Sequence, residues 1–252
     1  METIYFIVNA GGCSIRCKRY ARERDEIETV VLFGHGFGGH KDNRAAERFA
    51  GRLLEKNRGV AVVTFNFPCH GDDVRKKLRL EDCDAYLHAM IAYLNEKYHS
   101  PALYAYATSF GGYLFLKYVS EHGNPFERLA FRCPAVNMHE VLWGVMTEEE
   151  QKKVARGKTA QVGFDRKIGV DTPLLESLRD ADIRTRDFRP FADRILILHG
   201  DRDEVVPYAE GSAFAEKNGI LFETSEGTDH RFQNPQHMGH AIEEILSFFG
   251  MA

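Results

Sequence analysis

One serine in this chain combines a reactive hydroxyl with a turn that could expose it. Ser109 lies in the run Ala-Thr-Ser-Phe-Gly at 107–111, after a strand-like segment at 102–106 and before a helix-like segment at 113–120. Small neighbours permit a strained turn that lifts the hydroxyl above a sheet edge, with a helix N-terminus behind it. This pattern predicts a nucleophile, and an ordinary turn or N-cap serine is the alternative. Ala107 replaces the first glycine of the usual Gly-x-Ser-x-Gly pattern.

A glycine-rich loop upstream could supply hydrogen-bond donors to the same chemistry. The run Gly-His-Gly-Phe-Gly-Gly at 34–39 follows an apolar, strand-like segment at 29–33. Such a loop can aim a backbone N–H at the oxygen that becomes negative during acyl transfer. We expect the amides of Phe37 and Phe110 to form this oxyanion hole. A phosphate-binding loop is the alternative, but the glycine spacings of the P-loop and of dinucleotide-binding turns are absent.

A carboxylate that could orient a catalytic histidine follows another predicted strand. The block His-Gly-Asp-Arg-Asp-Glu-Val-Val-Pro at 199–207 comes directly after the strand-like run 194–198. A loop at the carboxyl end of a parallel strand can deliver an aspartate to the tautomer-fixing position beside a general base. We select Asp203 for this role over Asp201 and Glu204, and a solvated loop carboxylate is the alternative for each of them.

A histidine that could serve as the base comes last in the chain. His230 lies in a loop between the strand-like run 221–224 and a terminal helix expected at 235–249. A lone loop histidine is often only a surface residue. The order serine, acid, histidine is, however, the order expected when the serine occupies a strand-to-helix turn. His237 and His240 are rivals that fall on the terminal helix.

These motifs resemble those of the α/β-hydrolase family over nearly the whole chain. The matching blocks are the loop from His35, the run Phe-Asn-Phe-Pro-Cys-His-Gly-Asp at 65–72, the serine turn, the block 199–207 and the Asp-His-Arg-Phe run at 229–232. The resemblance implies Ser109 as nucleophile, Asp203 as acid and His230 as base, with no metal or organic cofactor. Within the family the chain is most similar to single-domain esterases and serine aminopeptidase-like hydrolases, including feruloyl or cinnamoyl esterases.

The elements that must position these residues alternate along the chain. A hairpin of 4–8 with 14–19 is followed by strands at 29–33, 60–65, 102–106, 129–132, 194–198 and 221–224, and by helices at 43–56, 81–98, 113–120 and 235–249. This alternation predicts an α/β fold with a mostly parallel twisted sheet and helices on both faces. We expect one domain, 1–252, whose function gathers beyond the carboxyl ends of the strands.

The stretch at about 137–190 is too long for a simple crossover between two strands. Within it we expect a helix at 147–158, an irregular segment at 163–172 and a short helix at 174–181. Placed over the strand ends, this insertion would form a small helical cap that shapes the substrate pocket. Trp143 and Phe164 are the apolar residues expected on its inner wall, and anchoring of the cap is the alternative role for both.

Composition narrows the class of partner. The 252 residues carry a net charge of −4, and the pI near 6.3 gives no basic footprint for nucleic acid or anionic membrane. Without a long apolar run or a signal peptide at the start, we expect a cytoplasmic protein with a small-molecule partner; oligomeric state stays open. Five scattered cysteines suggest neither a disulfide framework nor a structural zinc site. Cys69 beside His70 is a minor alternative nucleophile.

The function expected from these features is two-step hydrolysis of a carboxylic ester with a small or medium acyl group. One alternative is hydrolysis of peptides from the N-terminus, which requires a cap carboxylate, such as Glu140, Glu148 or Asp165, to pair with the substrate ammonium. The other is a binding module that keeps the fold without the chemistry.

Overall fold

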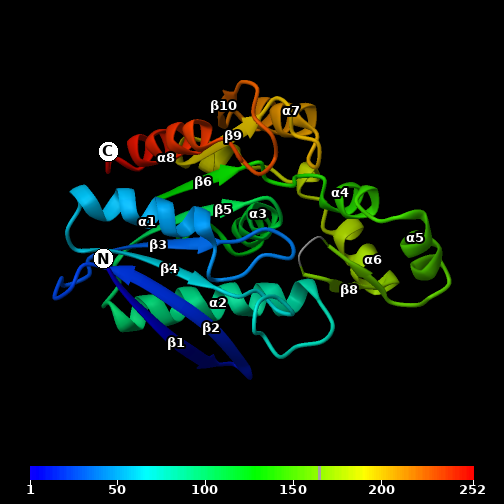
Figure 1. Ribbon diagram of the computed structural model, residues 1–252, viewed down its shortest axis with the longest axis horizontal. Helices are drawn as coiled ribbons and strands as arrows, with labels where there is room; N and C mark the ends of the chain where they lie inside the picture. Colours follow the sequence, from blue (N-terminus) through cyan, green and yellow to red (C-terminus); the bar gives the residue numbers. More distant parts are fainter. Residues whose placement is uncertain (164–165) are drawn as a thin grey trace.

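A twisted sheet of eight strands forms the centre of the computed structural model, which describes residues 1–163 and 166–252 (Figure 1). In spatial order the strands are β1 (Glu2–Ala10), β2 (Cys13–Ala21), β4 (Val60–Phe65), β3 (Thr29–Gly34), β5 (Ala102–Thr108), β6 (Arg128–Arg132), β9 (Ile195–Gly200) and β10 (Leu221–Ser225). The pairs β1–β2 and β2–β4 are antiparallel, and the other pairs are parallel. The predicted mostly parallel sheet is therefore confirmed.

The central strands are apolar because both of their faces are covered. Every residue of β4 and of β9 is buried, and only Thr29 in β3 is partly exposed. Continuous runs of this kind are typical of parallel strands between two helical layers. The β1–β2 hairpin turns through Gly11 and Gly12, whose φ values of 55° and 76° suit the tight turns that join twisted strands.

Helices cover both faces of the sheet, as predicted. On one face α2 (Leu80–Lys97), α3 (Phe110–His122) and α7 (Tyr208–Asn218) contribute to one hydrophobic core. On the other face α1 (Arg44–Lys56) and α8 (Pro235–Phe249) pack side by side and form a second core with the opposite sides of the strands. The two cores fix the strand ends from which the candidate site projects.

The segment between β6 and β9 lies beyond the carboxyl ends of the parallel strands (Figure 1). It contains α4 (Met138–Gly144), α5 (Glu148–Ala155), β7 (Ala160–Val162), β8 (Ile168–Val170), α6 (Thr172–Asp180) and the 3-10 turns η1 (Ile183–Thr185) and η2 (Arg189–Arg194). The expected helices at 147–158 and 174–181 correspond to α5 and α6. We refer to residues 137–190 as the cap.

Two features of the cap differ from the sequence-based expectation. The short helix α4 was not anticipated, and the segment 163–172, expected to be irregular, contains β8 paired antiparallel with β7. Each of these strands has three residues, so their periodicity is too short to recognise in the sequence. Val162, Ile168 and Val170 are buried in the same hydrophobic core as residues of α2 and α3, so packing of their side chains stabilises the small sheet.

Polar contacts attach the cap to the central domain. Arg79 donates from Nη1 to Asp171 Oδ1 at 2.9 Å and from Nη2 to Oδ2 at 2.7 Å, and Asp171 also caps the N-terminus of α6. At the C-terminal end of α6 the Tyr113 hydroxyl donates to the carbonyl of Ala181 at 3.1 Å.

Across the residues described, no helix is long and apolar enough to cross a bilayer.

Candidate active site

Ser109 occupies a strained turn between β5 and α3. Its φ of 51° and ψ of −118° lie in a region that residues with a side chain rarely adopt. Backbone hydrogen bonds hold this conformation from both sides: the Ser109 N–H donates to Arg132 O at 3.0 Å, and Ser109 O accepts from Tyr113 N at 3.1 Å. The sheet and the helix thus fix the serine at the carboxyl end of β5, as the sequence predicts.

Small residues around the serine allow α3 to approach β3 closely. A Cβ atom at Gly111 would lie 2.6 Å from His35 O and 2.7 Å from Gly34 O, which is closer than real Cβ atoms come. Ala107 is fully buried beside Gly34 of the neighbouring strand, and a Cβ at position 34 would lie only 3.1 Å from its methyl group, so the glycine at 34 leaves room for this methyl. Ala107 is therefore accommodated where the usual motif has glycine.

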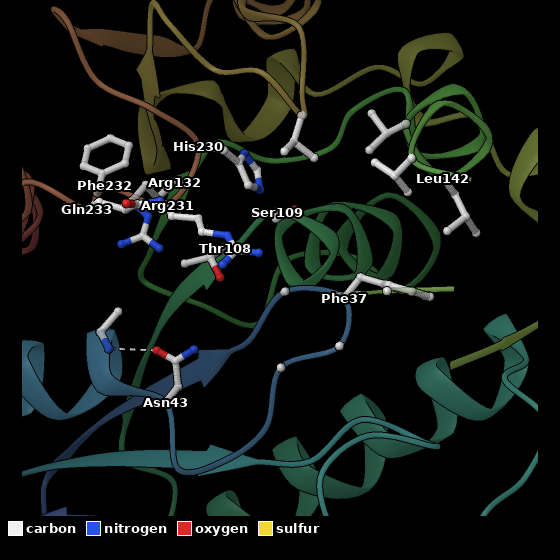
Figure 2. A pocket seen from close by; sticks show the side chains of 18 of the residues that line it. Phe37, Asn43, Thr108, Ser109, Arg132, Leu142, His230, Arg231, Phe232 and Gln233 are labelled. Carbon is white, nitrogen blue, oxygen red and sulfur yellow. Dashed lines mark hydrogen bonds between the residues drawn. The ribbon is translucent and has the colours of Figure 1, made fainter. Parts of the chain in front are cut away.

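The predicted acid and histidine meet beside this turn. Nδ1 of His230 lies 2.7 Å from Oδ2 of Asp203. Asp203 is held by the N–H groups of Val205 at 2.8 Å and Val206 at 2.7 Å, which bond to Oδ1. Because the carboxylate accepts from Nδ1, the Nε2 atom of His230 is left as a proton acceptor. Figure 2 shows the His230 ring pointing toward Ser109.

A second histidine contacts the same carboxylate and was not singled out from the sequence. Nε2 of the fully buried His199 lies 3.2 Å from Asp203 Oδ2 and 3.1 Å from Val206 O. Since both neighbours are acceptors, Nε2 carries the proton. Gly211 leaves room for this ring, because a Cβ there would lie 2.5 Å from its Nδ1. The only sequence signal was its place at the start of the block 199–207.

Hydrogen bonding keeps Asp203 ionised. Burial by itself would raise the pKa of this carboxyl group. The hydrogen bonds from His199 and His230, the charge of His230 when protonated and the backbone N–H of Val206 outweigh that effect and hold the pKa of Asp203 well below its usual value. An ionised acid is the state that can orient a histidine base and stabilise its imidazolium.

The predicted oxyanion-hole donors flank the serine turn. The ring of Phe37 packs edge to face on that of Phe110, with centroids 5.7 Å apart. Neither backbone N–H donates to an acceptor within residues 1–163 and 166–252. Hydrogen bonds of His35 hold the loop in place. Its Nε2 accepts from the backbone N–H of Phe67 at 3.2 Å, so the ring proton is on Nδ1, which donates to the carbonyl of Gly36 at 2.9 Å. These amides are thus available to a ligand at Ser109.

Ser109 and His230 open into a cavity of about 830 Å³. Its wall on the cap side consists of Met138, Val141, Leu142 and Val145. Trp143 is not among the lining residues and is 37% exposed, so the expectation that it forms the inner wall is corrected. The inward residues follow helical i, i+3, i+4, i+7 spacing, which turns position 143 to the other side. Phe164, the other expected wall residue, lies outside the described residues.

The rival residues have other contacts. His237 Nδ1 lies 2.8 Å from the Thr228 hydroxyl, and His240 is exposed beside Glu244. Asp201 accepts from Gly227 N at 2.6 Å. The remaining acid, Glu204, contacts only the backbone N–H of His230, at 3.3 Å, among the contacts of described residues.

The Cys69–His70 pair lacks the charges that a thiolate nucleophile needs. Burial raises the pKa of the Cys69 thiol to about 11, and the nearby Asp73 acts in the same direction. Burial also lowers the pKa of His70 to about 4. A neutral thiol therefore lies near a neutral imidazole, whereas an activated cysteine requires a depressed pKa.

Two groups of metal-ligand residue types occur in the described part of the chain. Cys133, His199 and Asp203 lie together behind His230, and Asp84, Glu121 and His122 lie nearer the surface. In the first group Asp203 already contacts both histidines, and burial raises the pKa of Cys133 well above its usual value. These atoms form a hydrogen-bonding network that supports the His230–Asp203 pair.

Solved structures of similar fold include several hydrolases. Est1E from Butyrivibrio proteoclasticus with bound ferulic acid superposes with a TM-score of 0.75 at 19% identity, covering 97% of this chain and 99% of that one. An esterase domain from Rhodothermus marinus gives 0.71 at 18% identity, with 98% of both chains covered. A monoacylglycerol lipase from Paleococcus ferrophilus gives 0.69 at 16%, with 94% of this chain and 99% of that one covered. At these identities the likeness establishes the fold.

Sequence comparison supplies the family. No curated protein sequence matches the chain. The model of the prolyl oligopeptidase family, peptidase S9, matches residues 55–252, which include the serine turn, the acid block and the histidine loop. Together with the fold and the arrangement of Ser109, Asp203 and His230, this match shows that the chain belongs to the prolyl oligopeptidase family of α/β hydrolases.

Proposed function

We propose that the protein is a serine hydrolase that cleaves carboxylic esters of small or medium acyl groups through an acyl-enzyme on Ser109. One observation carries this proposal: a serine in a strained strand-to-helix turn opens into the same cavity as a histidine whose Nδ1 is 2.7 Å from an aspartate with a fully covered side chain. Residues in this arrangement can perform nucleophilic acyl transfer.

The proposed reaction has two steps. His230 Nε2 takes the proton of Ser109 as the hydroxyl attacks the ester carbonyl, and the Phe37 and Phe110 amides stabilise the oxyanion. The protonated histidine then gives its proton to the leaving alcohol. In the second step His230 activates a water molecule that hydrolyses the acyl-enzyme, and Asp203 orients the imidazole throughout.

Peptides are the second candidate substrate, because the matched family model is named for peptide hydrolysis. An aminopeptidase needs a carboxylate for the substrate ammonium. Glu140 pairs with Arg184 at 2.9 Å and Glu148 with Lys152 at 3.3 Å, and neither lines the cavity. Asp165 lies outside the described residues.

The described cavity lining offers one carboxylate, Glu150. Its Oε2 already accepts from the Thr147 backbone N–H at 2.8 Å and lies 3.0 Å from the Thr147 hydroxyl in a capping box at the start of α5. These contacts favour an ester over a peptide N-terminus. Hydrolysis of aminoacyl p-nitroanilides, measured beside hydrolysis of esters, compares the two candidate substrate classes directly.

Labelling with a fluorophosphonate tests the proposal, because this probe reacts only with an activated serine. We expect an adduct on Ser109, located by peptide mass analysis, that is absent in Ser109→Ala and strongly reduced in His230→Ala. Ester turnover should fall by a factor on the order of 10⁶ in Ser109→Ala. Folded wild-type protein that takes no label and hydrolyses no ester in a panel of short, long and aromatic acyl esters would contradict the proposal and favour a binding module.

A further inference from the structure

The cavity extends to both sides of Ser109, and its two sides differ in chemistry. Figure 2 shows Ser109 and His230 between apolar side chains that include Leu142 and polar side chains that include Arg132 and Arg231. We call the first side the apolar arm; it is lined by Met138, Val141, Leu142, Val145 and Val205. We call the second side the cationic arm; it is lined by Arg44, Arg48, Arg132 and Arg231.

Positive charge is concentrated in this cavity, although the whole chain has a net charge of −4. Its described lining contains one lysine, Lys167, and the four arginines of the cationic arm, against one acid, Glu150. For Arg44, Arg48, Arg132 and Lys167, no ion pair with a carboxylate forms within residues 1–163 and 166–252. The N-terminus of α1, capped by Asn43, lines the same arm and adds to the positive potential.

Arg132 is the most unusual of these cations because it is only 8% exposed. Its guanidinium stacks on the Phe232 ring at 5.0 Å, Nη1 lies 3.1 Å from Met238 Sδ, and Nε has no hydrogen-bond partner. A buried arginine is normally paired with a carboxylate or phosphate. Its charge is therefore left for a ligand to neutralise.

The fold places this guanidinium next to the reacting position. Arg132 is the last residue of β6, stands opposite Thr108 of β5, and accepts the Ser109 N–H at its carbonyl. Side chains alternate along β6, so Leu129 and Phe131 enter the core under α3, whereas Ala130 and Arg132 face α1 and α8. A substrate bonded to Ser109 can thus reach the cationic arm with one end.

We infer that the substrate carries a negatively charged group, a carboxylate or a phosphate, on one side of the scissile ester and an apolar chain on the other. The anionic group binds the cationic arm, where the guanidinium of Arg132 can donate a charge-assisted hydrogen bond to it, and the chain fills the apolar arm. This inference rests on the proposed ester hydrolysis at Ser109.

Matched pairs of esters test the inference. In the first pair, 4-(butyryloxy)benzoate and its neutral carboxamide, the charge is on the leaving group. In the second, monophenyl adipate and its neutral carboxamide, the charge is on the acyl group. We expect kcat/KM for the anionic member to exceed that of the neutral member by about tenfold or more in at least one pair, from a charge-assisted hydrogen bond. This preference should shrink as salt is raised.

Two exposed residues of α1 provide the variants. Arg44→Gln combined with Arg48→Gln removes two charges of the cationic arm, and we expect the anionic-to-neutral ratio of kcat/KM to fall several-fold. Arg52→Gln is the matched control, since Arg52 lies on the same helix, is ion-paired with Glu55 and does not line the cavity. The anionic-to-neutral ratio of kcat/KM for this control should equal that of the wild type.

Substitutions of Arg132 test the buried guanidinium. Arg132→Lys keeps the positive charge but loses the planar guanidinium, so it should lower the anionic-to-neutral ratio of kcat/KM less than Arg132→Met, which removes the charge.

The outcomes separate this inference from the proposed function. If the neutral esters are hydrolysed as well as the anionic ones in both pairs, ester hydrolysis stands and the inference is wrong. If no ester is hydrolysed, the proposed function fails, and calorimetry on Ser109→Ala with the amide analogues of both pairs decides the anion site. Tighter binding of a carboxylate than of its carboxamide, lost on Arg44→Gln with Arg48→Gln, would support the site; equal affinity or no binding would overturn it.

Discussion

Ser109, the proposed nucleophile, has a strained backbone conformation. A non-glycine residue at φ 51° and ψ −118° costs about 1–3 kcal/mol, and the neighbouring strand and helix must hold it there. The hydrogen bonds from Ser109 N to Arg132 O and from Tyr113 N to Ser109 O do so. The conformation that exposes the proposed nucleophile therefore lowers the stability of the fold.

Removing the side chain at position 109 should stabilise the protein. Glycine tolerates the observed dihedral angles, so we expect Ser109→Gly to raise the free energy of unfolding by about 1 kcal/mol, after the greater flexibility of glycine in the unfolded chain is subtracted. Ser109→Ala keeps the Cβ atom, so its free energy of unfolding should rise much less. Urea denaturation of the two variants and the wild type measures this; equal stabilities of both variants would contradict the assigned strain.

The elements around the serine are brought together by glycines. α3 begins so close to the end of β3 that a Cβ at Gly111 would collide with the carbonyl oxygens of Gly34 and His35. This contact sets the distance between the serine turn and the glycine-rich loop that carries Phe37. The spacing of the candidate oxyanion-hole donors is thus a property of how two elements pack.

Two helix glycines should respond in opposite ways to the same substitution. We expect Gly111→Ala to destabilise the protein by more than 2 kcal/mol, roughly the cost of overpacking a core, because backbone atoms cannot move aside. Gly51→Ala is the control. It lies inside α1 with nothing within 4 Å of a new Cβ, and it should stabilise the helix by about 0.5–1 kcal/mol. Thermal or urea unfolding gives both values; a neutral Gly111→Ala would show that this approach is not tight.

Long elements with clear ends were predictable from the sequence, and short ones were not. The predicted helix 235–249 coincides with α8, where Asn234 caps the start, Pro235 is the first residue and Gly250 follows the end. By contrast α4, β7 and β8 are too short for periodicity to show, and tertiary contacts decide them.

The same distinction applies to the site. Ser109, Asp203 and His230 each follow a recognisable strand, so their meeting could be predicted from the order of the motifs. The direction in which the Trp143 side chain points depends on how α4 packs against the rest of the protein. The neighbouring residues in the sequence do not reveal this packing. The cationic arm was also not foreseen, because its arginines are scattered along the chain and only the fold gathers them.

Across the whole molecule, buried histidines connect stability to pH. His35 and His70, which follow β3 and β4, are both fully buried with ring centroids 5.1 Å apart. Burial lowers the pKa of His35 well below its usual value and the pKa of His70 to about 4. Both rings are therefore neutral in the folded protein at pH values where an unfolded chain would protonate them.

The free energy of unfolding should decline as the pH falls from about 6.5 toward 4. In that interval the unfolded state binds more protons than the folded state, so stability that is fully present above about pH 6.5 is lost toward the folded pKa. Each histidine contributes a slope of up to about 1.4 kcal/mol per pH unit. We expect His70→Gln to flatten the slope between pH 7 and 5, measured by urea denaturation, and His240→Gln, at an exposed position, to leave it unchanged.

The separation of the site residues along the chain has a consequence for biosynthesis. The first of them follows β3, the second follows β5, and the last two come after β9 and β10 on the far side of the cap. A nascent chain emerging from the ribosome therefore contains the proposed nucleophile long before it contains the proposed base. Under the proposed mechanism, a translation product that stops before residue 230 lacks the base, so we expect it to hydrolyse no ester even though its serine turn has been made.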